Sequence, residues 1–227
     1  MYFKKLIVFF LFSWLSFVSA QAQFIPVNGE WLHFSYSKLT LLNTPPDLVE
    51  KWNSQGWQLM FMRETRLGLR SHFAFAYGLG FSTNYWHTNL NIKTLPQGGI
   101  SYQYLPTDST YKTNRFSANY IDLPIEFRYR SKSNHKGRYF RFYVGGLVGY
   151  KINSFSEFKE SNYNVKFYKI TDLASWHYGV FVRTGFWLFN LYAYYGLNPV
   201  FSDIKVGNAP EGLGDMHSFS LGLSISL

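Results

Sequence analysis

The sequence has 227 residues, contains no cysteine and carries little charge. Without disulfides the fold must be held by backbone pairing and packing, and no lipid-modified cysteine can anchor the chain. Charged residues make up 15% of the chain, against about 25% in an average soluble domain. Beyond residue 22 no run of 18 apolar residues occurs, which excludes a bundle of membrane helices. The hydrophobic content of 47% excludes a disordered chain. An all-β protein remains, either soluble or set in a membrane.

The N-terminal residues 1–22 have the pattern of a secretory signal. Two lysines precede an apolar stretch, and an Ala-Gln-Ala segment with a small-x-small pattern follows it. The stretch is short for a retained membrane anchor, which is the alternative. We therefore expect export and a mature domain of residues 23–227. Loss of Lys4 and Lys5 reduces Lys and Arg from 22 to 20 against 13 Asp and Glu, which leaves a net charge of +7.

The charge balance bears on the expected partners. A positive excess favours phosphates or anionic lipid headgroups. Nucleic acid is not an expected partner, because the chain is exported and shows neither a basic helix nor a zinc-binding pattern.

Alternation of apolar and polar residues predicts eight strands. The pattern is clearest in 73–82, 121–130 and 217–227. Weaker alternation marks five further segments: 31–41, 56–66, 139–151, 175–188 and 190–198. Each predicted strand has roughly 9–14 residues, longer than the average of about 5–6 in soluble proteins. This length matches the roughly 9–11 residues that a tilted strand needs to cross a membrane.

The faces of these strands indicate which side meets lipid. In 73–82 five large apolar side chains share one face, and the other face holds only Ala, Gly and Ser. A soluble barrel with the large apolar side chains inside would have an outer surface of Ala, Gly and Ser along this strand. A membrane barrel instead places the large apolar side chains toward lipid. The residues expected to face lipid are Phe73, Phe75, Tyr77, Leu79, Phe81, Leu123, Ile125, Phe127, Phe219, Leu221, Leu223 and Ile225.

The connections between the predicted strands alternate in length. Short connections near 67–71, 131–138 and 188–190 alternate with long ones near 42–55, 87–118, 152–174 and 199–215. Outer-membrane barrels have short periplasmic turns and long external loops. Since closure also removes unpaired strand edges, we expect an all-β, eight-stranded, antiparallel, up-and-down transmembrane barrel in the outer membrane.

Tryptophans near the predicted strand ends are typical of the aromatic girdles at the two headgroup levels. The alternative is that they are ordinary strand residues of a packed core. The tryptophans concerned are Trp31, Trp57, Trp86, Trp176 and Trp187.

Charged residues on the opposite strand faces predict an ionic interior. The expected members of this lumen network are Asp122, Glu126, Arg128, Arg130, Arg141, Lys151 and Arg183. If the turn at 131–138 forms a hairpin, Glu126 should lie near Arg141 and Tyr143. The network either lines a narrow conduit or plugs the barrel, and the small lumen of eight strands favours a plug.

One region of the sequence is similar to a known family. Tyr120-Ile121-Asp122-Leu123-Pro124, then Phe127-Arg128-Tyr129, then the segment 142–150 (FYVGGLVGY) resemble the PorT-like outer-membrane β-barrel family of Bacteroidota. The resemblance implies an integral outer-membrane barrel. Most members have no known activity, and a few belong to the type IX secretion and gliding apparatus. It therefore implies a structural or interaction component of the envelope, with other envelope or secretion proteins as partners.

An enzyme is the less favoured interpretation. Asp215, His217 and Ser218 are adjacent, and His87 and Asp108 share a long loop. In a strand Asp215 and His217 share a face that Ser218 does not, so these three residues are poorly placed for a triad. The histidines show no metal-ligand spacing. We expect no catalytic, cofactor or metal site. A small-solute or lipid-handling barrel, pore or enzyme, stays as the alternative, and a soluble lipocalin-like binder is opposed by the charged face of 121–130.

The long loops are rich in aromatics: Trp86, Tyr102, Tyr104, Tyr111, Tyr163, Phe167 and Tyr168. Exposed, they would suit adhesion or partner contact. Alternatively the loops continue the strands above the membrane, since 101–105 and 163–170 alternate well enough for that. At the other end, the turn 131–138 is basic, and is either simply solvated or in contact with periplasmic partners or lipid phosphate.

Overall fold

The computed structural model describes residues 29–68, 71–95, 99–106, 111–202, 204 and 209–227. The expected signal segment 1–22 and the candidate Asp108 lie outside these residues. None of the described residues forms a helix long and apolar enough to cross a membrane.

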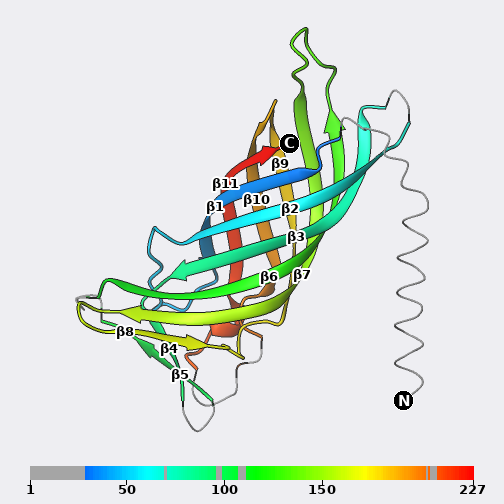
Figure 1. Cartoon of the computed structure of the whole chain (residues 1–227). Coiled ribbons are helices and arrows are strands. Elements are labelled where there is room, and N and C mark those ends of the chain that lie inside the picture. The colour runs from blue at the N-terminus through cyan, green and yellow to red at the C-terminus, as the bar shows by residue number, and fades with distance from the viewer. Residues whose placement is uncertain (1–28, 69–70, 96–98, 107–110, 203, 205–208) are drawn as a thin grey trace, which may run out of the picture.

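The described chain consists of strands and one short 3-10 helix (Figure 1). The elements are β1 (Leu32–Leu42), β2 (Gln55–Arg66), β3 (Phe73–His87), β4 (Leu90–Thr94), β5 (Ile100–Tyr104), β6 (Thr113–Arg130), β7 (Phe140–Lys159), β8 (Asn164–Tyr168), β9 (Trp176–Phe186), β10 (Phe189–Pro199), η1 (Leu213–Asp215) and β11 (His217–Ser226).

Eight of these strands close into a ring. Going around it, β1, β2, β3, β6, β7, β9, β10 and β11 each pair antiparallel with the next strand. β11 closes on β1 from His33↔Ser226 to Leu42↔His217. The predicted eight-stranded antiparallel up-and-down barrel is confirmed, and within this ring every strand has a partner on both sides.

Three strands are longer than the sequence pattern indicated. β3 has 15 residues, β6 has 18 and β7 has 20, and all three continue beyond the ring at the end that carries the long loops. The β6–β7 ladder shifts register between Asn119 and Tyr120. A bulge of this kind bends a strand and interrupts its alternation. The sequence pattern therefore showed the strand only from residue 121 onward, although β6 begins at residue 113.

The extended wall carries two further strands. β8 adds to the outer part of β7 through pairs from Phe155↔Tyr168 to Lys159↔Asn164. β4 and β5 form a separate hairpin beside this wall (Figure 1). The segments 101–105 and 163–170 thus contain strands above the ring, which is the second of the two interpretations of the loops.

An apolar core fills the barrel at the long-loop end, and we call it the cap core. Its buried residues are Leu39, Leu41, Leu48, Trp86, Leu90, Ile92, Ile100, Phe116, Ala118, Tyr120, Ile170, Leu173, Val200, Phe201, Leu213 and Met216. They come from the long-loop ends of β1, β3 and β6, the β1–β2 connection, the β4–β5 hairpin and the segments before β9 and β11. Burial of so many large side chains favours an ordered cap over four independent loops.

Trp86 is the exception among the tryptophans expected at the headgroup levels. Its side chain is only 1% exposed and stacks on Phe116 with ring centroids 5.1 Å apart. The girdle prediction is wrong for this residue, because β3 continues past the ring and turns Trp86 into the cap core. Trp31, Trp176 and Trp187 lie exposed on the outer surface near strand ends.

Candidate functional site

The two faces of the ring differ sharply in chemistry. On the outside Leu123 and Leu223 are 58% and 61% exposed. The other residues expected to face lipid are also exposed, except Phe81 and Phe219, which are half-buried. On the inside Asp122, Glu126 and Arg183 have no exposed surface. Along β6, exposed apolar side chains on the outside thus alternate with buried charged side chains on the inside.

Glu126 occupies the centre of the ionic interior. Arg128 Nη2 lies 2.9 Å from Glu126 Oε2, and Arg183 Nη1 donates to Glu126 Oε1 over 2.7 Å. Glu126 stands opposite Ala76 on β3 and Gly145 on β7. These small partners leave room in the lumen for the two guanidinium groups.

A second carboxylate, Glu64 of β2, holds the next layer toward the short-turn end. Arg128 Nη1 donates to Glu64 Oε2 over 2.6 Å, and Arg130 Nη1 donates to Glu64 Oε1 over 2.5 Å. The Arg130 Nε atom also donates to the hydroxyl of Tyr143 over 2.7 Å. Two arginines on one face of β6 are therefore bridged by a single carboxylate from β2, the next strand but one in the ring.

The third carboxylate, Glu30, closes the short-turn mouth of the barrel. It precedes β1 and is 5% exposed. Its carboxylate accepts hydrogen bonds of 2.9 Å from the hydroxyls of Tyr139 and Tyr143. Arg141 Nε lies 2.6 Å from Glu30 Oε1, an ion pair in which that nitrogen makes no hydrogen bond. The segment before the first strand thus supplies a counter-ion to the mouth.

The expected contact between Glu126 and Arg141 is wrong. In the β6–β7 ladder Glu126 stands opposite Gly145, whereas Arg141 stands opposite Arg130. The hairpin connection runs from Ser131 to Tyr139, so the register differs from the one that a turn at 131–138 would give. Arg141 pairs instead with Glu30, which lay outside every predicted strand.

Lys151 is also not part of this network. Its side chain turns inward at the other end of β7, where Nζ donates to the backbone carbonyl of Ile170 over 3.1 Å and to that of Leu173. It therefore ties the loop before β9 to the barrel wall. The sequence placed it on the correct face but could not give its height along a tilted strand.

His33 and His177 complete the polar interior. Arg128 donates through Nη2 to His33 Nε2 over 2.6 Å, so the proton of the His33 ring is on Nδ1, which lies 2.7 Å from Ser226 Oγ. His177 Nε2 lies 2.6 Å from Asp122 Oδ1. A Cβ on Gly149 would come within 2.2 Å of that carboxylate oxygen, so glycine is required beside this pair.

The candidate residues of the less favoured enzyme interpretation have separate surroundings in the described structure. Asp215 lies in η1, His217 Nδ1 lies 2.9 Å from the Gly196 carbonyl, and Ser218 Oγ is buried without a partner. In the described part of the chain no three His, Asp or Glu side chains are grouped as a metal site would need.

Two small voids lie inside the ring, among the described residues. One of about 30 Å³ is lined by serines of β1 and β11 and by Gln58, and another of about 20 Å³ lies beside His177 and Tyr194. Spaces of this size hold one or two water molecules. Among the described residues, the ionic network and the cap core occupy the two halves of the interior.

A family model for the outer membrane protein beta-barrel domain matches residues 32–202. The chain belongs to this family. As a member of the outer membrane beta-barrel family it resides in the outer membrane. From the general pattern of such barrels we expect its short turns to face the periplasm and the cap core to lie outside. No curated protein and no solved structure matches the chain.

Sequence reasoning missed several members of the network in this family member. Glu64 lies two residues before the end of the predicted strand 56–66, on the face opposite Arg63, so counting faces would have found it. His177 could be found in the same way on the strand 175–188. Glu30 carries no such signal, because nothing in the sequence tells where the segment before β1 lies.

The cap end contains a histidine that should make its stability depend on pH. Burial, then the charges of Arg115 and Lys51, lower the pKa of His87 below its usual value of 6.5, although Glu157 opposes this shift. A base with a lowered folded-state pKa destabilises the fold as pH falls through its unfolded value. We expect amide hydrogen exchange in β4 to become faster, after correction for intrinsic rates, between about pH 7.5 and about pH 5.5.

The matched variant for this test is His87→Gln, which stays neutral over the whole range. It should remove most of the pH dependence of exchange in β4. Equal pH dependence in His87→Gln and in the parent chain would contradict the assignment to His87.

Proposed function

We propose that the protein is a non-enzymatic integral outer-membrane barrel that serves the cell envelope as a structural and interaction component. It acts through its external cap, takes no cofactor and contacts lipid through its apolar outer face. The single observation that supports this proposal best is the filled interior. Glu30, Glu64 and Glu126 neutralise arginines across the periplasmic half, and the cap core closes the external half.

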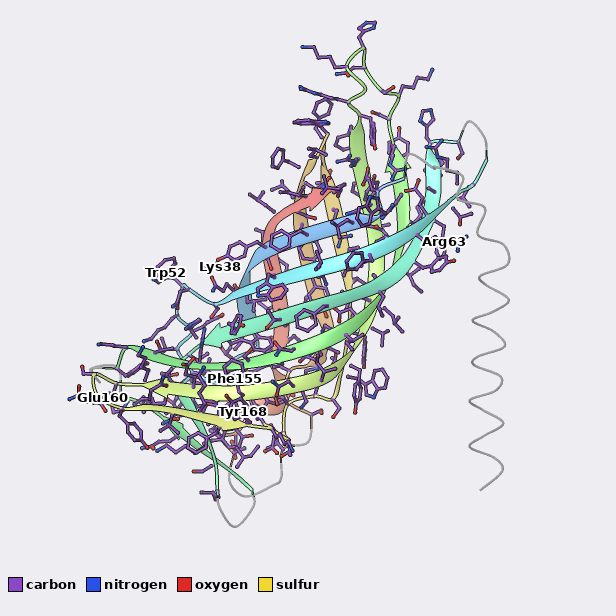
Figure 2. All side chains as sticks on the ribbon, viewed as in Figure 1. Lys38, Trp52, Arg63, Phe155, Glu160 and Tyr168 are labelled. Carbon is purple, nitrogen blue, oxygen red and sulfur yellow. The ribbon has the colours of Figure 1, made fainter. Side chains whose placement is uncertain are left out.

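The cap presents side chains that suit contact with another protein. Trp52, Tyr163 and Tyr168 are 84%, 59% and 57% exposed. Figure 2 shows Trp52, Glu160 and Tyr168 around the long-loop end. The cap itself is tied together, for example by the 2.7 Å hydrogen bond from the Tyr102 hydroxyl to Asp172. Large exposed aromatics on an ordered support are typical of interaction surfaces.

The likeness of 120–150 to the PorT-like branch favours a partner within a secretion or adhesion assembly. Stoichiometric co-purification from native membranes in a mild detergent would test this. Trp52→Ser combined with Tyr168→Ser should release such a partner, whereas Trp187→Ser, at the opposite end of the barrel, should retain it. Purification of the full chain without any stoichiometric protein would count against an interaction role.

The alternative of a small-solute pore makes the opposite prediction for conductance. Because the interior voids are about 30 and 20 Å³, we expect no steady ion current when the purified protein is inserted in planar bilayers. A bilayer that receives detergent alone serves as the blank. A stable single-channel current above this blank would overturn the plugged barrel.

A further inference from the structure

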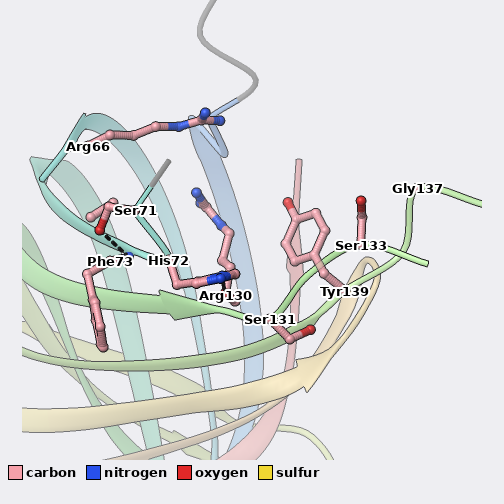
Figure 3. Close-up of a pocket in the computed structure, with 10 residues that line it drawn as sticks. Arg66, Ser71, His72, Phe73, Arg130, Ser131, Ser133, Gly137 and Tyr139 are labelled. Atoms are coloured by element: carbon pink, nitrogen blue, oxygen red, sulfur yellow. Dashed lines mark hydrogen bonds between the residues drawn. The ribbon is translucent and has the colours of Figure 1, made fainter. Parts of the chain in front are cut away.

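A pocket of about 510 Å³ opens at the periplasmic mouth, outside the filled lumen. It lies between the β2–β3 and β6–β7 connections (Figure 3). Its size falls within the range of small-molecule sites, about 300–1,000 Å³. Nothing in the account of the lumen or of the cap requires this pocket.

The described lining is cationic and contains no carboxylate. Arg66 and Arg130 approach the space from two sides, and in Figure 3 Arg66 extends across its top while Arg130 and Tyr139 point toward it. Arg130 is engaged by Glu64, but no described residue forms a hydrogen bond or ion pair with the side chain of Arg66. Three serines and His72 add hydrogen-bonding groups around the space.

The wall behind the pocket adds to the positive field. In the described network four arginines, Arg128, Arg130, Arg141 and Arg183, pair with three glutamates, Glu30, Glu64 and Glu126. Arg141 Nη1 is buried and has no hydrogen-bond partner. Arg141 lies against Tyr139, with its guanidinium 4.9 Å from the ring centroid. The fourth buried carboxylate, Asp122, lies farther along β6 and pairs with His177. The pocket thus adjoins the end of the ionic network that holds Arg130 and Arg141.

One edge of the pocket is apolar and continues onto the outer face of the barrel. Phe73 lines the pocket and stacks on Phe127 at 5.6 Å between ring centroids. Both rings are exposed on the outer surface. A ligand with an anionic head and an apolar tail can therefore place the head among the arginines and the tail along these rings.

We propose that this pocket binds a phosphate group, with Arg66 as its principal free ligand and Arg130, Tyr139 and the serines around it. Guanidinium forks match phosphate oxygens in a bidentate geometry. The phosphate can belong to a glycerophospholipid of the periplasmic leaflet or to a free phosphate. The apolar edge at Phe73 favours the lipid.

The test is calorimetric titration of the purified full-length protein in an uncharged maltoside detergent. The probes are inorganic phosphate, a short-chain phosphatidylglycerol below its micelle concentration, and the matching diacylglycerol without phosphate. We expect the phospholipid to bind and the diacylglycerol not to bind. Arg66→Gln should weaken phospholipid binding about ten-fold, or about 1.4 kcal/mol, and Arg66→Lys should weaken it less.

Arg63→Gln is the matched control, because Arg63 lies exposed on the outer face of the same strand β2 and does not line the pocket (Figure 2). It should bind as the parent does. Binding of inorganic phosphate alone, lost in Arg66→Gln, supports the phosphate site and assigns it to the free ion. Equal affinity in Arg66→Gln and the parent, or no binding of either phosphate probe, overturns the proposal. His72→Gln gives a second variant if Arg66→Gln fails to fold.

Discussion

Replacing Glu126 by glutamine should lower the free energy of unfolding by about 3–5 kcal/mol, the cost of leaving buried charges unpaired. Both of its carboxylate oxygens are engaged, one by Arg128 and the other by Arg183, and none of the three side chains is exposed. The amide keeps the volume but removes the negative charge. Two guanidinium groups then stay buried with too few counter-ions.

Equilibrium unfolding of the barrel from lipid vesicles in urea measures this change. Glu160→Gln is the control, because Glu160 is exposed at the β7–β8 turn (Figure 2). It should change stability by less than about 0.5 kcal/mol. Similar values for the two variants would contradict a closed ionic interior, since a hydrated lumen would screen the loss of Glu126.

The energetic origin of the effect can be separated with a second substitution. Replacing Glu126 and Arg183 together by leucines removes both charges of one pair and leaves apolar side chains of moderate size. Such replacements often restore stability that a single charge removal loses. The double variant should therefore be more stable than the Glu126→Leu single variant. A purely additive loss would show that the two side chains do not interact.

Replacing Leu123 by arginine should also be strongly destabilising, by about 2–4 kcal/mol if the residue lies near the bilayer midplane. Leu123 lies two residues from Ile121 and Ile125 on the outer face, and all three are exposed. In a soluble protein a charge on such an exposed position would be nearly neutral. The cost arises only because the surface is covered by hydrocarbon.

The control for this prediction is Asn153→Arg. Asn153 is exposed on the outer face of β7 beyond the bulge, on the part of the wall outside the ring. An arginine there should be nearly neutral, within about 1 kcal/mol. Folding into vesicles and urea titration measure both variants. A negligible cost for Leu123→Arg would place this face in water.

The ring was predictable because its strands carry their orientation in their own residues. From Phe73 to Phe81 every second side chain is large and apolar, and tight pairing requires glycine at Gly78, where a Cβ would lie 2.0 Å from the Phe61 carbonyl oxygen. Alternation with a period of two shows which residues of a strand face lipid and which face the interior, without any knowledge of the neighbouring strands. Eight such segments with alternating connection lengths leave few other architectures.

The extended wall was less predictable because the chemistry of its two faces is the reverse of that in the ring. Beyond the register shift at Asn119 the outer face of β6 carries the half-buried Arg115, which pairs with Glu157 of β7, and the inner face carries Phe116 packed in the cap core. The outer face there carries polar groups that suit water and not lipid, so the apolar outer pattern of the ring is lost. Local composition then resembles a loop, although the ladder continues.

The ionic network was predictable in its members on β6 and β9 but not in its pairing. Glu126, Arg128 and Arg183 have their inward direction from strand alternation. Which carboxylate meets which arginine depends on the stagger of the ring and on Glu30, which comes from outside the strands. Lys151 is a similar case. Strand alternation predicted that it faces inward, but not how far along the barrel it lies from the arginines and glutamates.

The orientation of the ring is tested most directly by nuclear magnetic resonance of methyl-labelled protein in lipid bilayers that carry a spin label at the acyl-chain end. Leu123 and Leu147 form the decisive pair, because they lie near one another on adjacent strands at 58% and 4% exposure. We expect the methyl signals of Leu123 and Leu223 to be strongly broadened and those of Leu147 and Met60 to stay sharp. Broadening of Leu147 and Met60 with sharp signals from Leu123 and Leu223 would contradict the account.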